Sequence, residues 1–338
     1  MAAHGSALVG KDEGHVTHAE GAVRSDLDRP GVPGRGARLS RVGVIGLGNI
    51  GGAIAPNLVE DGCRVTVFDL DRTRIDEAVG AGASPATSVA EVAAASGITF
   101  TSLPDPATVR TVATEWAAAA PVGTVLCDLS TTLPESNRAI AEELGATGHH
   151  FVEAPLTGGH VGAVHRKLVF MVGGEDDAVA VVAPVLESLG RGTFHLGPVG
   201  AGTTMKLANS LLAFSGAVAA LEAVSLAARA GIDVRTAVDI VKLSGPSNYY
   251  LDRGIEGINT RGGPTEFSLQ LAAKDARLIT EVGAAEGVPT SVGEAALEFL
   301  TDAVERGLGE RDWSDLVLAA EARAGLELRI APPAEEAG

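Results

Sequence analysis

Between residues 41 and 200, short runs of β-branched residues alternate with longer Ala-rich stretches, and this alternation constrains the fold more than any other feature. Strands are predicted at "RVGVIG", "RVTVFD", "GITFTS", "GTVLCDLS" and "HHFVEAP", with helix-like sequence between each strand and the next. Such a pattern is typical of a parallel sheet built from βαβ units. Two further predicted strands, "KLVFMVGG" and "RGTFHLG", extend this domain to about Gly200.

The chain changes character after Gly200. Helices without intervening strands are predicted over 203–230, 233–243, 266–286, 290–306 and 312–324. We therefore expect an α/β domain over 41–200, followed by an all-α C-terminal domain over 201–330. Residues 1–40 contain no aromatic residue and their charges cancel, so we expect a disordered tail there.

A glycine fingerprint follows directly after the first predicted strand, in "VGVIGLGNIGG". Gly46 permits a tight turn, Gly48 lets the backbone approach a pyrophosphate, and Gly51 lets the helix pack on the strand. The helix N-terminus then offers N–H groups to the phosphates. This context predicts a Rossmann-type dinucleotide-binding domain. The predicted cofactor-binding residues in it are Gly46, Leu47, Gly48, Asn49, Ile50 and Gly51.

Asp69 ends the second predicted strand, 23 residues after Gly46. A carboxylate at about this separation accepts hydrogen bonds from the adenosine ribose and repels a 2′-phosphate. NAD is therefore the predicted cofactor, while Arg72 and Arg74 keep NADP as an alternative. The other interpretation of Asp69 is a cap for the helix that follows.

Composition limits the class of partner. The net charge of −17 argues against nucleic acid and anionic membranes. Polar residues interrupt the apolar helix predicted over 203–230, so we do not expect it to span a membrane. Cys63 and Cys127 lie in apolar runs without metal-ligand spacing. This favours reduced packing residues, no metal site and a cytoplasmic protein.

Lys206 is the single lysine in the long, otherwise apolar segment "AGTTMKLANSLLAFSGAVAALEAVSLAA". A buried and unpaired ammonium loses hydration, and the response is a lowered pKa, which suits a group that moves protons. A lysine that lies in water at the helix edge is the other interpretation. The apolar surface of this segment exceeds what one small helical domain can cover, so we expect a homodimer or homotetramer.

The sequence resembles the β-hydroxyacid dehydrogenases, the group that contains 3-hydroxyisobutyrate dehydrogenase and tartronate semialdehyde reductase. "GVIGLGNIGGAIAPNL" is similar to the opening of that family, and further blocks agree in order and spacing. These blocks are "SLPDPATV", "CDLSTTLPES", "EAPLTGGHVGA", "GPVGAGTTMKLANS" and "FSLQLAAKDARL". The resemblance spans about residues 42 to 325.

The resemblance implies further cofactor-binding residues. They are Leu103, Pro104 and Thr108 in the Leu-Pro loop, Thr131 beside the nicotinamide, and Lys274 in the helical domain. It also implies that Lys206 is the general acid/base of a hydride-transfer reaction. Chemistry supports that role, because reduction of a carbonyl needs a proton delivered to the oxygen as the hydride arrives.

A substrate site is implied by "EAPLTGGHVGA", in which Thr157, Gly158 and Gly159 offer a hydroxyl and backbone N–H groups to a carboxylate. The alternative is that the two glycines are plain turn residues. Many members of the family carry asparagine four residues after the lysine. Here Ser210 occupies that position, with Asn209 one residue earlier. Either Asn209 rotates inward, or water fills the gap, or the substrate differs.

Two other segments depart from the family pattern. His165 and Arg166 occupy what is usually a small-residue turn, and a solvated hairpin tip is favoured there over substrate contact. Residues 248–250, Asn-Tyr-Tyr, stand where an aromatic side chain often closes the pocket, with core packing as the alternative.

These observations together predict an NAD-preferring dehydrogenase or reductase. It would transfer a hydride between the cofactor and a small β-hydroxy acid or the corresponding semialdehyde. An imine reductase-like enzyme is the enzymatic alternative, although that group usually has Asp or Tyr in place of the lysine. The other alternative is a non-catalytic dinucleotide-binding protein.

Overall fold

The computed structural model describes residues 41–245, 257–258 and 260–330. Two predictions lie outside the described residues. One is the disordered tail over 1–40, and the other is the role of the Asn-Tyr-Tyr segment at 248–250.

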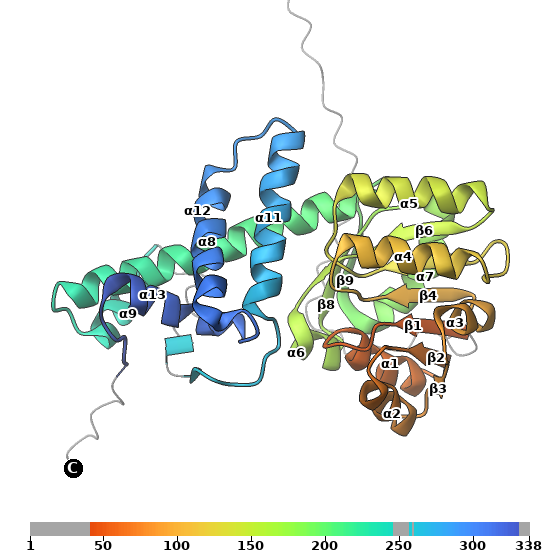
Figure 1. Ribbon diagram of the computed structural model, residues 1–338, viewed down its shortest axis with the longest axis horizontal. Coiled ribbons are helices and arrows are strands. Elements are labelled where there is room, and N and C mark those ends of the chain that lie inside the picture. The colour runs from red at the N-terminus through yellow and green to blue at the C-terminus, as the bar shows by residue number, and fades with distance from the viewer. Residues whose placement is uncertain (1–40, 246–256, 259, 331–338) are drawn as a thin grey trace, which may run out of the picture. The chain divides into compact units, whose positions relative to one another are not determined.

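A six-stranded parallel sheet forms the first half of the described chain (Figure 1). Its strands are β1 (Arg41–Ile45), β2 (Arg64–Phe68), β3 (Ser84–Pro85), β4 (Ile98–Thr101), β5 (Val125–Asp128) and β6 (His150–Glu153). Their order is β3-β2-β1-β4-β5-β6, and every pairing is parallel. The predicted parallel sheet is confirmed. The two-residue strand β3 was missed because it is too short to carry a pattern.

Helices cover both faces of this sheet. They are α1 (Gly51–Glu60), α2 (Arg72–Gly80), α3 (Val89–Ala95), α4 (Pro106–Ala117) and α5 (Pro134–Ala146), together with α7 (Asp176–Leu189). Buried side chains of α1, α2 and α7 share one core cluster with Val44, whereas those of α3, α4 and α5 share another with Ile45. Adjacent residues of a buried strand thus point into opposite layers, which explains its continuous apolar sequence.

The last two predicted strands form a separate three-stranded sheet and do not lengthen the parallel one. This sheet contains β7 (Leu156–Thr157), β8 (Leu168–Val172) and β9 (Gly190–His195), with the short helix α6 (Gly159–Val164) between β7 and β8. β7 is antiparallel to β8, and β9 is parallel to it. A bridge between Glu153 and Gly173 connects the ends of β6 and β8.

From residue 201 onward the described chain is helical, as predicted. Its helices are α8 (Ala201–Arg229), α9 (Val234–Lys242), α11 (Leu269–Ala285), α12 (Ser291–Ala303) and α13 (Leu316–Ala324). The predicted helix over 290–306 ends early, in a wider turn over Val304–Leu308 that Gly307 breaks with φ +82°. The predicted helix over 312–324 begins with a 3₁₀ turn, Trp313–Asp315.

Helix α8 is long and apolar enough to cross a membrane by length and composition, with a mean hydropathy of 1.9. In this structure one side of it is buried and contacts α11, α12 and α13. Its side chains Leu207, Phe214 and Leu221 belong to a helical core cluster separate from the two sheet clusters. The fold is therefore α/β, with a Rossmann-type sheet followed by an all-α C-terminal region.

Candidate active site

The predicted cofactor residues lie at the carboxyl edge of the parallel sheet, where strand order reverses. β1 pairs with β2 on one side and with β4 on the other, so the chain leaves β1 at a topological switch point. Open α/β sheets bind ligands in the crevice at that point. Gly46 begins the turn there, with φ +86°, and its N–H donates to the Phe68 carbonyl at 3.0 Å.

The three fingerprint glycines meet different surroundings. A Cβ on Gly51 would lie 1.8 Å from the Gly46 oxygen, and a Cβ on Gly46 would lie 2.3 Å from the Ser102 oxygen. These two positions need glycine for close packing. A Cβ on Gly48 would meet only Arg74, at 3.7 Å. The space beside Gly48 is therefore open, which fits the approach of a dinucleotide pyrophosphate.

Asp69 supports the fingerprint turn directly. Its Oδ2 accepts a hydrogen bond from the Leu47 N–H at 2.6 Å, and its Oδ1 accepts one from the Asp71 N–H at 2.8 Å. Arg74 lies 3.9 Å from the same carboxylate. The interpretation of Asp69 as the cap of the next helix is wrong, because Asp71 caps α2 through the Thr73 N–H. Each oxygen of an ionised carboxylate can accept about two hydrogen bonds, so both oxygens of Asp69 can still accept one from a ribose hydroxyl.

Asn49 joins the fingerprint to two distant segments, a role that the sequence did not suggest. Its side-chain amide donates to the carbonyls of Thr265 and Glu266, at 3.2 and 2.6 Å, just before α11. Its backbone oxygen lies 2.9 Å from Nδ1 of His160 in α6. Beside it, a cleft of about 390 Å³ is lined by Gly48, Asn49, Arg74 and His160 among others. Of the other two fingerprint residues, Leu47 is buried and Ile50 precedes α1.

At the ends of β4 and β5, the Leu-Pro loop contacts the turn that contains Ser130 and Thr131, which we call the Ser-Thr turn. The Leu103 N–H donates to the Ser130 hydroxyl at 2.9 Å. Pro104 is exposed, and Thr108 donates its N–H and its hydroxyl to Asp105, at 2.9 and 2.8 Å. The Thr108 N–H lowers the pKa of Asp105, and the positive charge of Lys274 contributes to the same effect.

Asp128 is a buried acid at this edge that the sequence analysis did not single out. Its Oδ1 accepts hydrogen bonds from the Thr101 and Ser130 hydroxyls at 2.7 and 2.6 Å, while its Oδ2 has no partner among the described residues. Burial raises the pKa of Asp128 to about 6, against the opposing effect of these hydrogen bonds. The signal available in the sequence was an aspartate that ends an otherwise apolar strand.

Lys274 reaches from α11 to the Ser-Thr turn. Its Nζ donates to the Thr131 carbonyl at 2.9 Å and lies 2.8 Å from the carboxylate of Asp275. Asp275 is itself buried, with 3% of its surface exposed. The structure thus brings together two predicted cofactor residues that are 143 positions apart.

Lys206 lies in the second turn of α8 and is half-buried. Its Nζ makes no hydrogen bond or ion pair within the part of the chain that the structure describes. Burial lowers the pKa of Lys206, Lys274 lowers it further, and Asp275 opposes both effects. The interpretation as a solvated lysine at a helix edge does not fit this burial.

The predicted substrate residues form two groups. Thr157 ends β7, and Gly158 and Gly159 follow with φ +123° and +61°. A Cβ on Gly159 would meet nothing within 4 Å, so the backbone there is open to a ligand. On α8, Asn209 is half-buried and Ser210 is buried. Neither side chain is hydrogen-bonded to another described residue.

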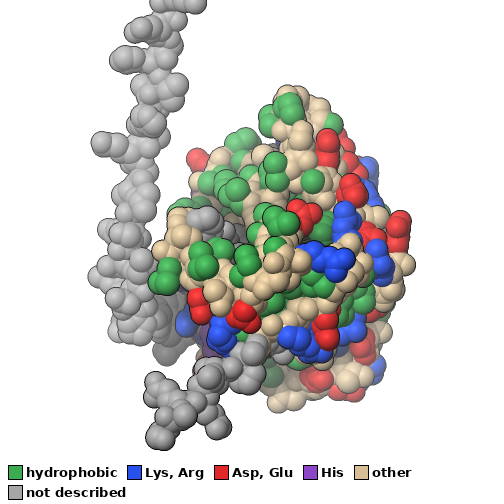
Figure 2. All heavy atoms as spheres, turned by 90° about the vertical axis from the view of Figure 1, so that its left-hand side faces the viewer, with side chains coloured by type: hydrophobic (Ala, Val, Ile, Leu, Met, Phe, Trp, Pro, Cys, Tyr) green, Lys and Arg blue, Asp and Glu red, His purple; other side chains and the backbone are tan. Residues whose placement is uncertain are grey.

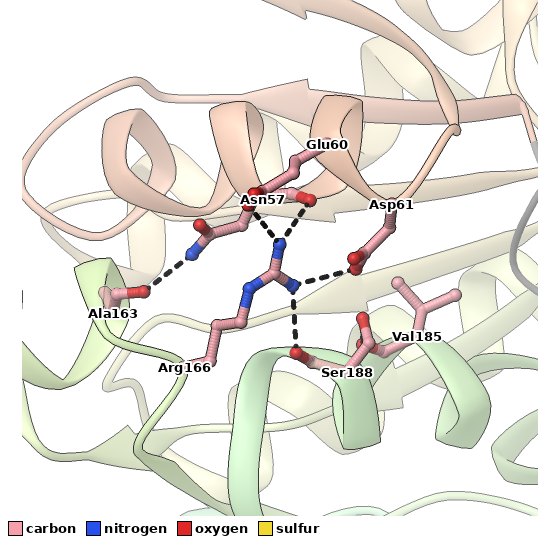
Figure 3. A network of polar contacts seen from close by, with 7 residues as sticks. All are labelled: Asn57, Glu60, Asp61, Ala163, Arg166, Val185 and Ser188. Atoms are coloured by element: carbon pink, nitrogen blue, oxygen red, sulfur yellow. Dashed lines mark hydrogen bonds and ion pairs between the residues drawn. The ribbon is translucent and has the colours of Figure 1, made fainter. Parts of the chain in front are cut away.

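Arg166 is not the solvated hairpin tip that the sequence favoured (Figure 3). Its guanidinium donates to the Asp61 and Glu60 carboxylates, both at 2.9 Å, and to the carbonyls of Asn57 and Ser188 at 3.0 and 3.1 Å. Only 7% of the Asp61 side chain is exposed. Arg166 thus anchors the turn after α6 to the C-terminal end of α1. The neighbouring His165 is exposed, as expected.

Comparison with known proteins agrees with this arrangement. A model of the NAD-binding domain of 6-phosphogluconate dehydrogenase matches residues 41–197, and a model of the NAD-binding domain of NADP-dependent 3-hydroxyisobutyrate dehydrogenase matches residues 200–320. The chain is 32% identical over 292 residues to 2-(hydroxymethyl)glutarate dehydrogenase of Eubacterium barkeri, which covers 85% of this chain and 97% of that protein.

The chain belongs to the β-hydroxyacid dehydrogenase family. β-Hydroxyacid dehydrogenases are NAD(P)-dependent oxidoreductases acting on CH–OH groups, and this protein is one of them. Another member, the NAD-dependent L-serine dehydrogenase of Pseudomonas aeruginosa, is 32% identical over 82% of this chain and 96% of its own.

Solved structures show the same fold. The 3-hydroxyisobutyrate dehydrogenase of Mycobacterium tuberculosis, in a structure with L-serine, has a TM-score of 0.76 at 26% identity, covering 83% of this chain and 98% of that one. An imine reductase from a Pseudomonas species has a TM-score of 0.57 at 23% identity, covering 83% of this chain and 99% of its own. At that identity the likeness to imine reductases concerns the fold alone.

No group of three or more potential metal-ligating side chains gathers among the described residues. Cys63 and Cys127 are both buried. Burial raises the pKa of each thiol, and the effect is larger for Cys127.

Proposed function

We propose that this β-hydroxyacid dehydrogenase interconverts a small 3-hydroxy acid and the corresponding semialdehyde or keto acid, with NAD as the preferred cofactor and Lys206 as the general acid/base. The observation that carries the proposal is the state of Lys206. It is a half-buried lysine in the second turn of α8, with a lowered pKa and no hydrogen-bond or ion-pair partner among the described residues.

The proton step follows from that state. Nicotinamide, when bound, supplies or accepts the hydride. In the oxidation direction the neutral amine of Lys206 takes the proton from the substrate hydroxyl, and its lowered pKa increases the neutral fraction near neutral pH. In the reduction direction the ammonium stabilises the developing oxyanion and returns the proton.

Neighbouring residues would orient the reactants. Thr131 lies at the turn that we assign to the nicotinamide, and Lys274 holds its carbonyl. Lys274 and Asp275 also act on the charge of Lys206, because Lys274 lowers its pKa and Asp275 raises it. Thr157 and the N–H groups of Gly158 and Gly159 would bind the substrate carboxylate, which in a chain of net charge −17 needs a locally favourable site. Asn209 and Ser210, whose side chains have no hydrogen-bond partner in the described ranges, would contact the rest of the substrate.

NAD is preferred in this proposal because the Asp69 carboxylate lies where the adenosine ribose would bind. Arg74, 3.9 Å from that carboxylate and half-exposed, is the residue that would accommodate the 2′-phosphate of NADP. Gly48, with open space beside it, supports the same placement of the pyrophosphate.

An imine reductase-like activity is the weaker alternative, because a lysine occupies position 206 and the imine reductase compared above shares only the fold. A non-catalytic dinucleotide-binding protein is also disfavoured. A half-buried lysine with a lowered pKa and no partner among the described residues is costly to the fold, and such perturbed groups are typical of catalytic sites.

We further propose the division into a tail over 1–40, a dinucleotide-binding domain over 41–200 and a substrate and oligomerisation domain over 201–330. Large apolar residues on α8, on α9 and just after α9 are strongly exposed, including Leu212, Leu226, Ile240 and Leu243 at 70, 74, 60 and 91%. Figure 2 shows hydrophobic side chains gathered over the upper part of the helical region, with charged side chains mainly to one side and below. This exposed surface supports a homodimer or homotetramer. A cytoplasmic location, without nucleic-acid or membrane partners, completes the proposal.

The proposal is tested by incubating the protein with NAD or NADP and a panel of 3-hydroxy acids, and measuring the formation of reduced cofactor. The 2-hydroxy isomers and 3-hydroxy amides serve as matched controls, which lack the right hydroxyl position or the carboxylate. Reduced cofactor should appear with 3-hydroxy acids and with NAD more efficiently than with NADP. Turnover of a cyclic imine in the reverse direction, with none for any hydroxy acid, would contradict it.

A further inference from the structure

A fully buried polar network joins the end of β6, the start of α5 and the first turn of α8. Its members are Thr132, Asn137, Glu153 and Thr203, and each is 0% exposed. A carboxylate that is fully buried destabilises the fold unless both of its oxygens accept hydrogen bonds. The hydrogen bonds of this network therefore define what Glu153 does.

Glu153 caps helix α8 from 47 residues upstream. The residue before the helix, Gly200, has φ +105° and provides no side-chain cap. Oε1 of Glu153 accepts the N–H groups of Gly200 at 2.7 Å and Thr203 at 3.1 Å. A helix N-terminus leaves such N–H groups without an intrahelical partner, and a negative charge is favourable there.

The other carboxylate oxygen connects α8 to α5. Oε2 of Glu153 accepts the Thr203 hydroxyl at 2.8 Å and the Asn137 side-chain amide at 2.7 Å. The same amide donates to the Thr203 hydroxyl at 2.9 Å, and Oδ1 of Asn137 accepts the Thr132 hydroxyl at 2.9 Å. Each of the four side chains is thus tied to at least one of the others.

The first turn of α8 lies directly on the backbone of β8. A Cβ on Gly202 would lie 2.3 Å from the Met171 oxygen, so no side chain separates the two elements. A Cβ on Gly173 would lie 2.5 Å from Oε1 of Glu153, so glycine is needed there to admit the carboxylate. Direct backbone contact with β8 and the hydrogen bonds of the network together fix the position of the first turn of α8, so the turn has little room to move.

We propose that Glu153 is a positioning residue, which holds the first turn of α8, and through it Lys206, in register with the Thr131 turn. The inference rests on the proposed role of Lys206. Thr203 precedes Lys206 by three residues, which places the two on one helical face. Thr132 follows Thr131, and Thr157 lies four residues after Glu153. One carboxylate therefore fixes the starting points of three segments that we assign to the active site.

The reaction rate is sensitive to the position of Lys206, because proton and hydride transfer require the reacting atoms to be aligned. A displacement of about 1 Å at a reacting group costs on the order of 10² in rate. None of the network's hydrogen bonds involves Lys206 or the fingerprint glycines. Its loss should therefore lower turnover while leaving the affinity for NAD unchanged.

The test uses a pair of variants of the full chain. In the parent, both oxygens of Glu153 accept hydrogen bonds. In Glu153→Gln an NH₂ group replaces one of these oxygens and faces the NH₂ group of Asn137, so two donors meet without an acceptor. In Glu153→Gln combined with Asn137→Asp, that NH₂ donates to the new carboxylate. The carboxylate can also accept the Thr132 and Thr203 hydroxyls. The double variant restores every hydrogen bond and the net charge, with only the position of the charge moved.

We expect kcat to fall about 10²-fold in Glu153→Gln and to recover at least tenfold in the double variant. The dissociation constant for NAD should stay within about threefold in both. The matched control is Leu186→Ala, a fully buried change on α7 that lowers the melting temperature without touching the network. It should leave kcat within about threefold.

A second readout does not depend on turnover. Labelling of Lys206 by an amine-acylating reagent, followed by peptide mass spectrometry across a pH series, reports its pKa. The charged groups that act on Lys206 are Asp275 and Lys274 of α11. If Glu153→Gln releases the helix turn toward water, the pKa of Lys206 should rise, and the double variant should restore it. This readout also separates the inference from the proposed function, because it applies to a parent protein that oxidises no hydroxy acid.

Three results would overturn the inference. The first is a folded Glu153→Gln variant with parental kcat and parental labelling. The second is a loss of NAD affinity as large as the loss of kcat. The third is a folded double variant with no recovery. Should Glu153→Gln not fold, Thr203→Val removes one hydroxyl at nearly constant shape. That variant is then expected to lower kcat about tenfold and to raise the labelling pKa, and parental values would reject the proposal.

Discussion

Two neighbouring turns of helix α8 differ in how well their polar side chains are hydrogen-bonded. At the first turn, Thr203 belongs to a buried network in which the Glu153 carboxylate accepts four hydrogen bonds. One turn later, Lys206 is half-buried and has no partner in the described chain. The first arrangement holds structure in place, and the second leaves an amine that we propose to be the reactive group. Active sites combine both, because a reactive group is useful only when its support is rigid.

The largest expected effect comes from removing the unpartnered group. Lys206→Ala should lower kcat by roughly 10² to 10⁴, the usual contribution of general acid–base catalysis. Lys206→Arg should fail almost as badly, because a guanidinium stays protonated at neutral pH. Steady-state kinetics in both directions checks this. A value of kcat within about threefold of the parent in both variants would retire the catalytic assignment.

The same residue gives a pH dependence of known sign. In the oxidation direction kcat should rise with pH as Lys206 loses its proton, with a midpoint below the usual value for lysine, because its pKa is lowered by burial. A folded-state pKa below the unfolded one stabilises the protein only above the unfolded pKa, and the contribution is lost as pH falls through the folded value. Lys206→Met should therefore raise the melting temperature near neutral pH while abolishing turnover.

Arg166 belongs to the supporting side of the comparison, so its loss should act on stability and not on the chemical step. Arg166→Met leaves Asp61 buried without its partner and should lower the free energy of unfolding by about 2–4 kcal/mol. The control is Arg110→Met, which breaks an exposed ion pair with Glu143 and should cost less than about 1 kcal/mol. Denaturant unfolding measures both. Equal losses in the two variants would show that the network contributes no more than a surface pair.

Asp128 is intermediate between the hydrogen-bonded Glu153 and Lys206, which has no partner in the described chain. Its Oδ1 accepts hydrogen bonds, and its Oδ2 has no partner among the described residues. Its pKa of about 6 lies above the ordinary value, so the native state binds the proton more tightly than the unfolded state. The stability that this group contributes is present below about pH 4 and lost as the pH rises to about 6. Asp128→Asn should therefore gain roughly 2–3 kcal/mol relative to the parent between pH 4 and 7. A constant difference in melting temperature across that range would contradict the raised pKa.

The smallest predicted effect concerns cofactor choice, because we propose that the Asp69 carboxylate, which supports the fingerprint turn, also recognises the cofactor. Asp69→Ala removes the repulsion of a 2′-phosphate, so the ratio of kcat/KM for NAD to that for NADP should fall at least tenfold, about 1.4 kcal/mol. Asp69→Asn is the matched control, since it keeps an acceptor for the Leu47 N–H. If Asp69→Ala alone lost activity with both cofactors equally, the residue would act only as a support for the turn.

Sequence by itself determined the features that depend on local spacing. The alternation after Arg41 predicted the parallel strands, and the apolar repeats after Gly200 predicted the helices, because each period places a continuous apolar face toward the core. The glycine spacing predicted the turn at the switch point, since only glycine tolerates the backbone contacts found at Gly46 and Gly51. Resemblance added the order of the motifs and, with it, the family.

Only the tertiary structure decided which distant groups meet. Arg166 looked like a solvated tip because its four partners come from α1, from Asp61 just after it and from α7, and no local pattern connects these to Arg166. Lys274 meets Thr131 across 143 residues, and Glu153 caps a helix whose own N-cap position is glycine. A buried polar group must find its partner wherever the fold brings a donor or acceptor near. Hydrogen bonding is satisfied in three dimensions, so the rigid support of this site could be seen only once the chain was folded.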